Sequence, residues 1–418
     1  MGEVGLVDFD DTVFLGQRIM QYRVDRSILL PRFLLYSFLS PDLQNQFRMH
    51  DGTGSVVSHI RVPDCSKFEL SLPPLAEQRR IVAILGSLDD KIQVNHQINQ
   101  TLEQMAQAIF KSWFVDFEPV KAKIAAKEGW LAMQPANEPS SPTCHADELA
   151  QLPSLESYMN QAAMQVLSGK NEAELTRMEA EQPSQFAELR ATAELFPAAM
   201  QDSELGEIPE GWTIEPFSSI ARLDTTSVKP AQEPEKVWEH YSIPAFDEGV
   251  FPAYDAGLEI KSNKYKVYPT AILSSKLNPH FPRTWVPDVE DPDAAICSTE
   301  FMQFVPLDPE QRAFIAGMVT SEPFQSGIMM RVTGSTGSRQ RAQPKQVAAM
   351  NIVLPSIELR EAYSQRTKAL LGMQAKNIWQ ARSLANLRDA LLPKLLSGEI
   401  SISAADSHYA ETTEPSSV

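Results

Sequence analysis

A long internal repeat is the sequence feature that most constrains how this chain can fold. Pro73 and Pro355 each follow a short apolar run and precede a long helical pattern. The interval between these two prolines, here called the repeat interval, also separates Leu88 from Leu370 and Leu102 from Leu384, and Gly54 and Gly337 keep it to within one position. Because this interval is far longer than the period of solenoid repeats, the sequence predicts two copies of one unit, a globular domain followed by a long helix.

The two copies are expected to differ in length. Residue 1 corresponds to residue 283, whereas the second copy is expected to begin near Ser203. The first domain is therefore expected to lack the N-terminal part that corresponds to residues 203–282 of the second copy.

Two segments show the heptad-like spacing of long pairing helices. Apolar residues recur at alternating steps of four and three over 77–113, and a matching pattern covers about 358–396. Each helix would be about 57 Å long at about 1.5 Å per residue, and two of them packed antiparallel would hold two domains apart. The alternative, two unrelated amphipathic helices, is disfavoured by the shared repeat interval.

Residues predicted to pair these helices follow from the same spacing. They are Leu85, Leu88, Asn95, Leu102, Leu370, Met373, Asn377, Leu384, Leu387, Leu391 and Leu395. Asn95 and Asn377 occupy the same repeat position, where a buried polar pair would fix the helix register at some cost in stability.

The rest of the chain predicts an α+β fold with two domains, the first of them truncated. Residues 206–355 combine prolines and polar turns with short β-prone runs at 272–274 and 301–305, which predicts a small mixed sheet with helices. Residues 1–72 are expected to form the remnant first domain, with a helix over Pro31–Leu39. The long helices are expected within 73–120 and 356–402, and 403–418 is expected to be a disordered tail.

Residues 121–205 are predicted to form an acidic insertion or linker that is partly helical. They contain thirteen acidic and six basic residues. A flexible break is expected over 135–142, and helices are expected over 147–166 and 172–180.

Composition narrows the class of protein. The chain has 418 residues and a net charge of −17, which argues weakly against nucleic acid as a partner. Three widely spaced cysteines do not form a disulfide framework or a zinc site. No apolar run approaches the ~20 residues of a membrane span, and no basic-then-apolar leader opens the chain, so we expect a soluble, cytoplasmic protein.

Catalytic signatures are missing from the sequence. It contains no phosphate-binding glycine loop, no metal-ligand spacing, no G-x-S-x-G elbow and no Asn-Pro-Pro-aromatic motif for a flipped adenine. Cys144-His145 lies in a Ser/Pro-rich stretch and favours a solvated pair over a metal site. Asp288 and Asp293 each follow a proline and are interpreted as turn residues. The sequence therefore predicts neither catalysis nor a bound metal or cofactor.

Basic residues around glycine- and hydroxyl-rich loops predict nucleic-acid binding. Residues 325–347 contain no acidic residue, and residues 260–283 interleave cations with Tyr265 and Tyr268. Backbone N–H groups, hydroxyls and clustered Lys and Arg suit phosphate contacts and guanine recognition. The alternative is a solvated basic face. The predicted DNA-binding residues are Lys261, Lys264, Lys266, Lys276, Arg283, Arg331, Thr336, Ser338, Arg339, Arg341 and Lys345, with Arg48, Thr53 and Ser55 in the first domain.

The acidic net charge does not exclude this prediction. The insertion contributes −7, and residues 399–418 contribute −4 with no basic residue. Electrostatic fields are local at a Debye length of about 8 Å. The overall acidity instead suggests that DNA affinity requires a more basic partner.

Three motifs are each similar to a region of one known protein family. The first is Leu72-Pro-Pro-Leu-Ala-Glu-Gln-Arg-Arg-Ile81, continued by Leu88-Asp-Asp-Lys-Ile92 and Phe114-Val-Asp-Phe-Glu-Pro-Val120, and it resembles the first conserved region of the specificity subunit of type I restriction–modification enzymes. The second, Leu205-Gly-Glu-Ile-Pro-Glu-Gly-Trp212, resembles the start of the second target recognition domain. The third, Leu387-Arg-Asp-Ala-Leu-Leu-Pro-Lys-Leu-Leu-Ser-Gly-Glu-Ile400, is similar to the end of the second conserved region.

The resemblance implies a non-catalytic DNA-recognition subunit. In that family two target recognition domains each read half of a bipartite DNA site, and the conserved helices set the spacing between the halves. The helices also dock two methyltransferase subunits, which bind S-adenosylmethionine and methylate adenine N6, and motor–nuclease restriction subunits join them. The competing hypothesis is a coiled-coil protein-interaction scaffold or a non-functional truncated subunit, for which weak salt dependence of nucleic-acid binding would be evidence.

Overall fold

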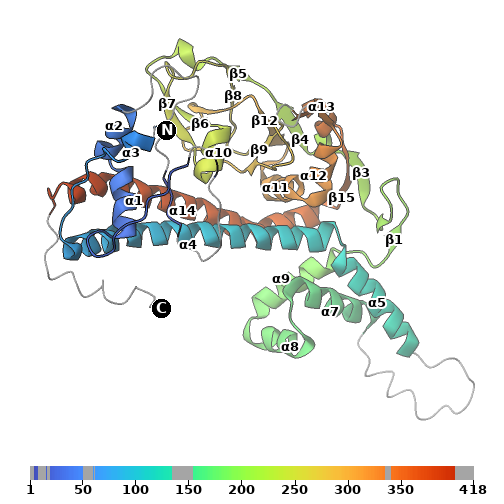
Figure 1. The fold of residues 1–418 in the computed structure, drawn as a ribbon. Helices are drawn as coiled ribbons and strands as arrows, with labels where there is room; N and C mark the ends of the chain where they lie inside the picture. The colour runs from blue at the N-terminus through green and yellow to red at the C-terminus, as the bar shows by residue number, and fades with distance from the viewer. Residues whose placement is uncertain are drawn as a thin grey trace, which may run out of the picture. The chain divides into compact units, whose positions relative to one another are not determined.

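Two compact units make up the chain. The computed structural model describes residues 4–7, 16, 19–49, 60, 62–133, 154–334 and 340–400. The first unit comprises Met1–Ile98 with Lys376–Val418, and the second comprises Asn99–Ala375. The unit boundaries fall inside two long helices, α4 (Leu75–Phe114) and α14 (Ile357–Leu396), so each unit contains part of both (Figure 1).

The predicted long helices are confirmed. Each has 40 residues, and their bounds lie close to the predicted spans. Pro73 and Pro74 precede α4, consistent with a helix start just after prolines. Gly86 does not interrupt α4, and a side-chain carbon there would lie 3.4 Å from the Arg32 guanidinium, so the glycine leaves room for a neighbouring helix.

The predicted duplication is confirmed by the order and spacing of helices. The first unit contains α1 (Pro31–Leu39), α2 (Pro41–Met49) and α3 (Val62–Cys65) before α4. The second contains α11 (Arg312–Thr320), α12 (Glu322–Met329) and α13 (Pro344–Ala348) before α14. Each helix of the second set begins one repeat interval after its counterpart, to within one position.

Local hydrogen bonds repeat with the helices. In the first unit Gln44 Nε2 donates to the carbonyl of Phe38 over 2.7 Å. In the second unit Gln325 Nε2, which corresponds to Gln44 to within one position of the repeat, donates to the carbonyl of Val319 over 2.6 Å. Ser40 Oγ and Ser321 Oγ likewise each donate to a carbonyl three positions before them, at the C-terminal ends of α1 and α11. The two copies therefore share the same hydrogen bonds at the connection between their first and second helices.

In the first unit, α1 packs on α4 and α14. Phe33, Tyr36, Ile81, Leu85, Leu392 and Leu395 form its buried core. Gln78 is fully buried on α4: its Oε1 accepts from the Leu30 N–H (2.9 Å), and its Nε2 donates to the Ile28 and Pro73 carbonyls (2.8 Å each). The Tyr36 hydroxyl donates to Asp89 over 2.6 Å, and burial with this carboxylate raises the pKa of Tyr36.

Cross-helix contacts show that α4 and α14 are antiparallel within each unit. In the first unit Asn95 Nδ2 donates to Gln380 Oε1 over 3.1 Å, and Arg388 Nη1 donates to Asp89 over 2.8 Å. In the second unit Asn99 Nδ2 donates to the Gln374 carbonyl over 3.2 Å. Asn95 is buried, as predicted, and its amide contacts Gln380, whereas Asn377 is only half-buried.

The predicted pairing stripe is partly wrong on α14. Leu387 and Met373 are 48% and 53% exposed, so neither lies in the helix interface. Arg388, adjacent to Leu387, turns toward α4 because its guanidinium binds Asp89. The interface then continues through Leu392, which is 4% exposed. Of the other predicted leucines, Leu85, Leu102 and Leu395 are buried, and four are half-buried: Leu88, Leu370, Leu384 and Leu391.

The second unit contains two sheets that confirm the predicted α+β class. A five-stranded sheet has the order β5 (Ser227–Val228), β8 (Lys264–Lys266), β11 (Ala295–Cys297), β6 (Val237–Tyr241), β7 (Ala253–Ala256). A four-stranded sheet has the order β10 (Thr284–Trp285), β9 (Ile272–Ser275), β12 (Phe301–Pro306), β4 (Ala221–Asp224). All of these neighbours are antiparallel except β6 and β11. The runs predicted at 272–274 and 301–305 are β9 and β12, paired with each other.

Shorter elements complete this unit. Three two-stranded pairs are β1 (Met200–Gln201) with β2 (Ile208–Pro209), β3 (Thr213–Pro216) with β15 (Asn351–Leu354), and β13 (Val332–Thr333) with β14 (Arg341–Ala342). Short helices are α10 (Ile243–Gly249), η1 (Phe217–Ser219), η2 (Pro230–Gln232) and η3 (Pro309–Gln311).

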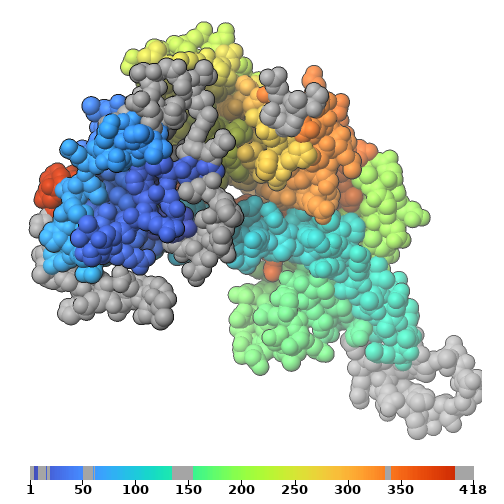
Figure 2. Space-filling model, in the orientation of Figure 1, coloured from blue at the N-terminus to red at the C-terminus, as the bar shows by residue number. Residues whose placement is uncertain are grey.

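The acidic insertion contains helices, as predicted, and they pack into a bundle over much of its length. It contains α5 (Glu118–Met133), α7 (Leu155–Ser168), α8 (Glu172–Glu181) and α9 (Pro183–Glu194). Its buried residues join the main core of the unit: Val120, Ala163, Met164, Leu167, Leu175, Leu189, Ala193 and Phe196. Figure 2 shows α7–α9, in green, gathered into one compact lobe. The predicted break at 135–142 and the tail at 403–418 lie outside the described residues.

A buried lysine in this bundle makes its stability depend on pH. Lys123 is 4% exposed, its Nζ donates to the Phe196 carbonyl over 2.6 Å, and burial lowers the pKa of Lys123 to about 8. Above this pKa the folded chain binds fewer protons than the unfolded one, so stability should rise with pH up to the ordinary lysine value. We expect Lys123→Met to reduce the gain in unfolding free energy between about pH 8 and 9.5 by about 1 kcal/mol.

Urea unfolding at several pH values measures this difference. Lys127→Met is the matched control, because Lys127 is exposed on the same helix, α5. The control should keep the slope of the wild-type chain. Equal slopes for Lys123→Met and the wild type would contradict the expected role of the buried ammonium group.

Candidate nucleic-acid interface

Three separate segments of the second unit meet at a polar surface. The Lys276 N–H donates to the Glu300 carbonyl, and the Ala342 N–H donates to the Lys276 carbonyl, each over 2.9 Å. An isolated β-bridge pairs Leu277 with Arg341. These backbone contacts place six polar side chains on neighbouring strands and loops. We call this group the Arg341 surface: Lys276, Glu300, Thr333, Gln340, Arg341 and Gln343.

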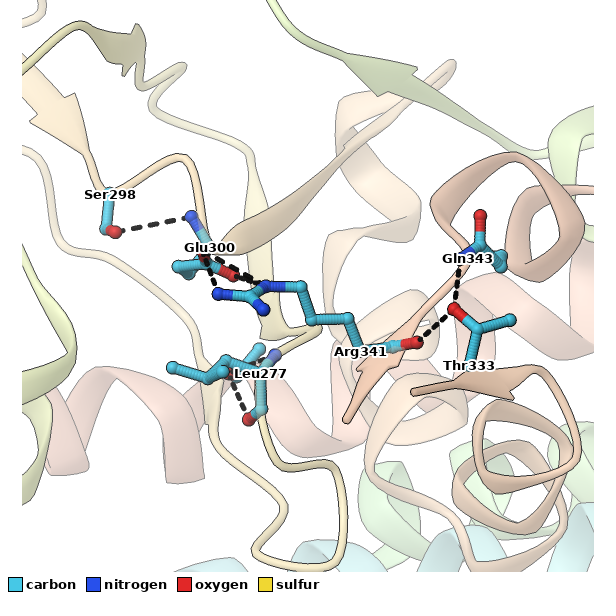
Figure 3. Close-up of polar contacts among 7 residues, drawn as sticks. Leu277, Ser298, Glu300, Thr333, Arg341 and Gln343 are labelled. Carbon is cyan, nitrogen blue, oxygen red and sulfur yellow. Dashed lines mark hydrogen bonds and ion pairs between the residues drawn. The ribbon is translucent and has the colours of Figure 1, made fainter. Parts of the chain in front are cut away.

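Arg341 is anchored on this surface by one carboxylate (Figure 3). Its Nε lies 3.1 Å from Glu300 Oε2, and its Nη2 lies 3.1 Å from Glu300 Oε1. The hydrogen bond to Glu300 raises the pKa of Arg341, whose side chain is 44% exposed, so the guanidinium stays charged. Thr333 Oγ1 donates to the Arg341 carbonyl over 3.4 Å, and Gln343 Nε2 donates to Thr333 Oγ1 over 2.6 Å.

The predicted cluster of cations at 260–283 is divided between two sheets. Lys264 and Lys266 lie on β8 of the five-stranded sheet, whereas Lys276 directly follows β9 of the four-stranded sheet. Lys264 Nζ donates to Ser262 Oγ over 2.8 Å, and Lys266 Nζ lies 3.5 Å from Asp293. The backbone therefore brings Lys276, but not the lysines of β8, beside Arg341.

Two predicted arginines have structural partners. Arg283 donates through Nε (2.7 Å) and Nη2 (3.0 Å) to Asp247 on α10, with its side chain 19% exposed. Arg331 Nη1 donates to the Gly327 carbonyl over 2.9 Å. The contacts with Asp247 leave little of the Arg283 guanidinium for a ligand, whereas Arg331 is half-buried and uses Nη1 for a backbone carbonyl.

Lys276, Lys261 and Lys345 remain available for a ligand. Within the described part of the chain, none of the three has a side-chain hydrogen bond or ion pair. Lys261 and Lys345 are exposed, and Lys276 is half-buried. In the first unit Arg48 is exposed and donates to Asn45 over 3.0 Å.

The glycine- and hydroxyl-rich loops lie outside the described residues. These loops hold the predicted Thr53, Ser55, Thr336, Ser338 and Arg339. Both loops follow the second helix of their repeat copy, α2 or α12, and precede the third, α3 or α13. Cys144 and His145 also lie outside the described residues.

Several residues of the interface were not predicted from the sequence. Glu300 lies in the turn before β12. Its carboxylate binds Arg341, which belongs to a segment, 325–347, without any acidic residue of its own. His280 Nε2 lies 2.7 Å from Gln340 Oε1 and extends the polar surface toward an open hollow of about 570 Å³. The hollow is lined by Pro279, His280, Pro282, Glu322, Gln325, Ser326, Met329 and Met330. No sequence pattern links these segments, because strand pairing alone brings them together.

The arrangement suits binding rather than catalysis. It presents guanidinium, ammonium and amide donors, and these groups contact phosphates and base edges. No group of three or more His, Cys, Asp or Glu side chains within the described ranges could hold a metal ion. None of the helices in those ranges is long and apolar enough to cross a membrane.

Comparisons with known proteins agree on one family. The family model for the type I restriction modification DNA specificity domain matches residues 1–104. The HindI specificity subunit of Haemophilus influenzae is 27% identical over 424 residues, covering 96% of this chain and 84% of that protein. The MjaIX specificity subunit of Methanocaldococcus jannaschii is 30% identical over 93 residues, covering 22% of this chain and 21% of that protein.

A solved structure of the same kind of subunit is less similar in sequence. The type I restriction–modification S subunit of M. genitalium is 13% identical, with a match that covers 89% of this chain and 74% of that one, and has a TM-score of 0.38. The sequence matches, which cover nearly the whole chain, and the duplicated helical unit are mutually consistent. By these matches the chain is similar to type I restriction–modification DNA specificity subunits over nearly its whole length, and residues 1–104 match the model of that family.

Proposed function

We propose that this chain is the DNA sequence-specificity subunit of a type I restriction–modification system. It reads a bipartite DNA site and positions adenine-N6 methyltransferase and restriction subunits on it. The similarity to the HindI specificity subunit, which extends over 96% of the chain, is the main support. The Arg341 surface supports DNA as the ligand, because its donors match phosphate oxygens and base edges.

The domain roles follow the duplication. Residues 206–355 form the second target recognition domain, and residues 1–72 contribute the first. The long helices α4 and α14 set the spacing of the half-sites. A cytoplasmic location follows from chromosomal DNA as the partner.

Exposed apolar side chains on the long helices are candidate contacts for the methyltransferase subunits. On α4, Val94 is 48% and Met105 is 49% exposed, and on α14, Leu387 is 48% exposed. Large apolar side chains at such exposure fit a surface that a protein partner covers. S-adenosylmethionine would bind to the methyltransferase partner, and motor–nuclease subunits would join the assembled complex.

Methylation mapping tests this function directly. The chain is co-expressed with the methyltransferase subunit of its own operon, and N6-methyladenine is located across the host DNA. A bipartite motif with a fixed spacer is the expected result. A stable complex that methylates no defined motif would contradict DNA recognition and favour a docking scaffold.

The salt dependence of DNA binding should identify the lysines that contact phosphates. We expect Lys276→Ala with Lys345→Ala to make the slope of log affinity against log salt about two units shallower, because each phosphate contact contributes about 0.9. Filter binding with the methyltransferase complex between about 50 and 200 mM salt measures the slope.

A matched control separates this effect from loss of charge alone. Lys127→Ala with Lys170→Ala removes the same charge from exposed positions in the helical bundle. The control should leave the slope unchanged. If both double variants behave alike, Lys276 and Lys345 do not contact the DNA backbone.

A further inference from the structure

Two arginines of the second unit each hold a carboxylate through two nitrogens, and they differ in which N–H donors remain unused. Both Arg341 and Arg283 bind a carboxylate through Nε and Nη2, which is one side of the guanidinium. In Arg283 the far nitrogen, Nη1, also donates weakly to the Phe281 carbonyl, over 3.4 Å. In Arg341, Nη1 has no partner within the described residues, and the side chain is more than twice as exposed.

The free end of Arg341 has a defined chemistry. A guanidinium has five N–H donors in a rigid plane. When one side is held by a carboxylate, the two outer nitrogens still offer a pair of parallel N–H groups at the end of the plane. Two parallel donors match the O6 and N7 acceptors that guanine presents in the major groove.

The backbone on which Arg341 stands is fixed from both sides. Thr333 pairs with Arg341 across β13 and β14, and Leu277 bridges it from the other side. The adjacent Ala342 is 1% exposed, which anchors the strand in the core. Because Glu300 sets the plane of the Arg341 guanidinium, this side chain is already oriented before a ligand binds. Such preorganisation lowers the conformational entropy lost on binding.

We propose that Arg341 is a specificity-determining residue that recognises a guanine in the half-site of the second recognition domain, and that Glu300 is the positioning residue that orients it. This inference rests on the proposed function and assigns one base contact within it. Arg283 has no such role, because its carboxylate partner and the Phe281 carbonyl leave it little exposed. Arg341 therefore specifies one G·C base pair, whereas Lys276 and Lys345 act on the backbone without sequence preference.

Methylation motifs of point variants test the assignment. Wild type, Arg341→Lys, Arg341→Ala and Glu300→Gln are each co-expressed with the methyltransferase subunit, and methylated sites are compared position by position. Arg341→Lys keeps the charge but loses the fork, so discrimination at one G·C position should fall roughly 10- to 100-fold. Glu300→Gln should relax the same position by a smaller factor, because the amide still accepts one hydrogen bond from Arg341.

Lys345→Ala is the control, because Lys345 is an exposed cation close to Arg341 in sequence. It should lower methylation of all sites alike and keep the motif unchanged. Thermal unfolding and co-purification with the methyltransferase subunit establish that each variant folds and assembles; Arg341→Lys provides the test if Arg341→Ala does not fold.

The outcomes distinguish this inference from the function on which it rests. A wild-type complex without a motif overturns both. A wild-type motif that Arg341→Lys keeps at every position, with unchanged discrimination, overturns the assignment of Arg341 alone. Relaxation by Arg341→Lys but not by Glu300→Gln overturns the positioning role of Glu300.

Discussion

Phe314→Ala is expected to lower the free energy of unfolding of the second unit by about 3–5 kcal/mol. Phe314 on α11 is fully buried, and its ring centroid lies 5.7 Å from Phe110, 5.2 Å from Phe114 and 6.2 Å from Tyr363. These rings belong to α4 and α14, so Phe314 packs α11 against the helix pair within this unit. Alanine would leave a cavity that three helices cannot readily close.

Urea unfolding followed by tryptophan fluorescence measures this change. Phe281→Ala is the matched control, since Phe281 is 67% exposed in the same unit. The control should change the free energy of unfolding by no more than about 0.5 kcal/mol. Equal effects of the two substitutions would contradict the aromatic core as the main contact between these helices.

The helical part of the fold could be predicted because its signals are local and repeated. Pro31 and Pro73 lie at or just before helix starts, and the repeat interval recurs in the starts of the other helices. The error at Leu387 has a physical cause. Heptad spacing follows apolar residues alone, and it therefore predicts Leu387 in the helix interface. In the structure the neighbouring Arg388 takes that position, because its guanidinium binds Asp89 on α4.

The packing of the helical bundle at 118–196 could not be predicted from its acidic composition. Acidic residues lie on the surface of a bundle and give no information about its buried core. Its apolar residues are few but are spaced for burial, as at Ala163 and Leu167, four positions apart on α7. Asn171 caps α8 by accepting from the Glu174 N–H, while Glu174 accepts from the Asn171 N–H. This reciprocal pattern of an Asn followed three positions later by a Glu is a local signal that could have identified the helix start.

The interface was only half predictable. Basic residues and glycine loops identified Lys276 and Arg341, but their partner Glu300 lies 41 residues from Arg341 in sequence. The pairing of β9 with β12 and the bridge between Leu277 and Arg341 bring them together. Such register depends on the whole sheet, and a single sequence gives no measure of it.

Gln78→Met is expected to destabilise the first unit by about 2–4 kcal/mol, because it removes three hydrogen bonds that each contribute about 0.5–1.5 kcal/mol. The side-chain amide of Gln78 accepts one hydrogen bond from a backbone N–H, over 2.9 Å, and donates two to backbone carbonyls, over 2.8 Å each. Methionine fills a similar volume but leaves the Leu30 N–H and the Ile28 and Pro73 carbonyls without this partner.

The loss should appear first at the start of α1. Leu30 is the N-cap residue of α1 and has no side-chain cap of its own, so Gln78 supplies the contact from α4. We expect amide hydrogen exchange in the segment containing Leu30 to accelerate in Gln78→Met, whereas Gln93→Met, at an exposed position of α4, leaves it unchanged. The same helix position in the second copy, one repeat interval later, is Arg360, whose Nη1 donates to Gln311, the N-cap residue of α11. Both copies therefore use this position to hold the N-terminus of their first helix. If the Leu30 segment of Gln78→Met exchanges its amide hydrogens as slowly as the wild type, this shared contact does not stabilise the helix.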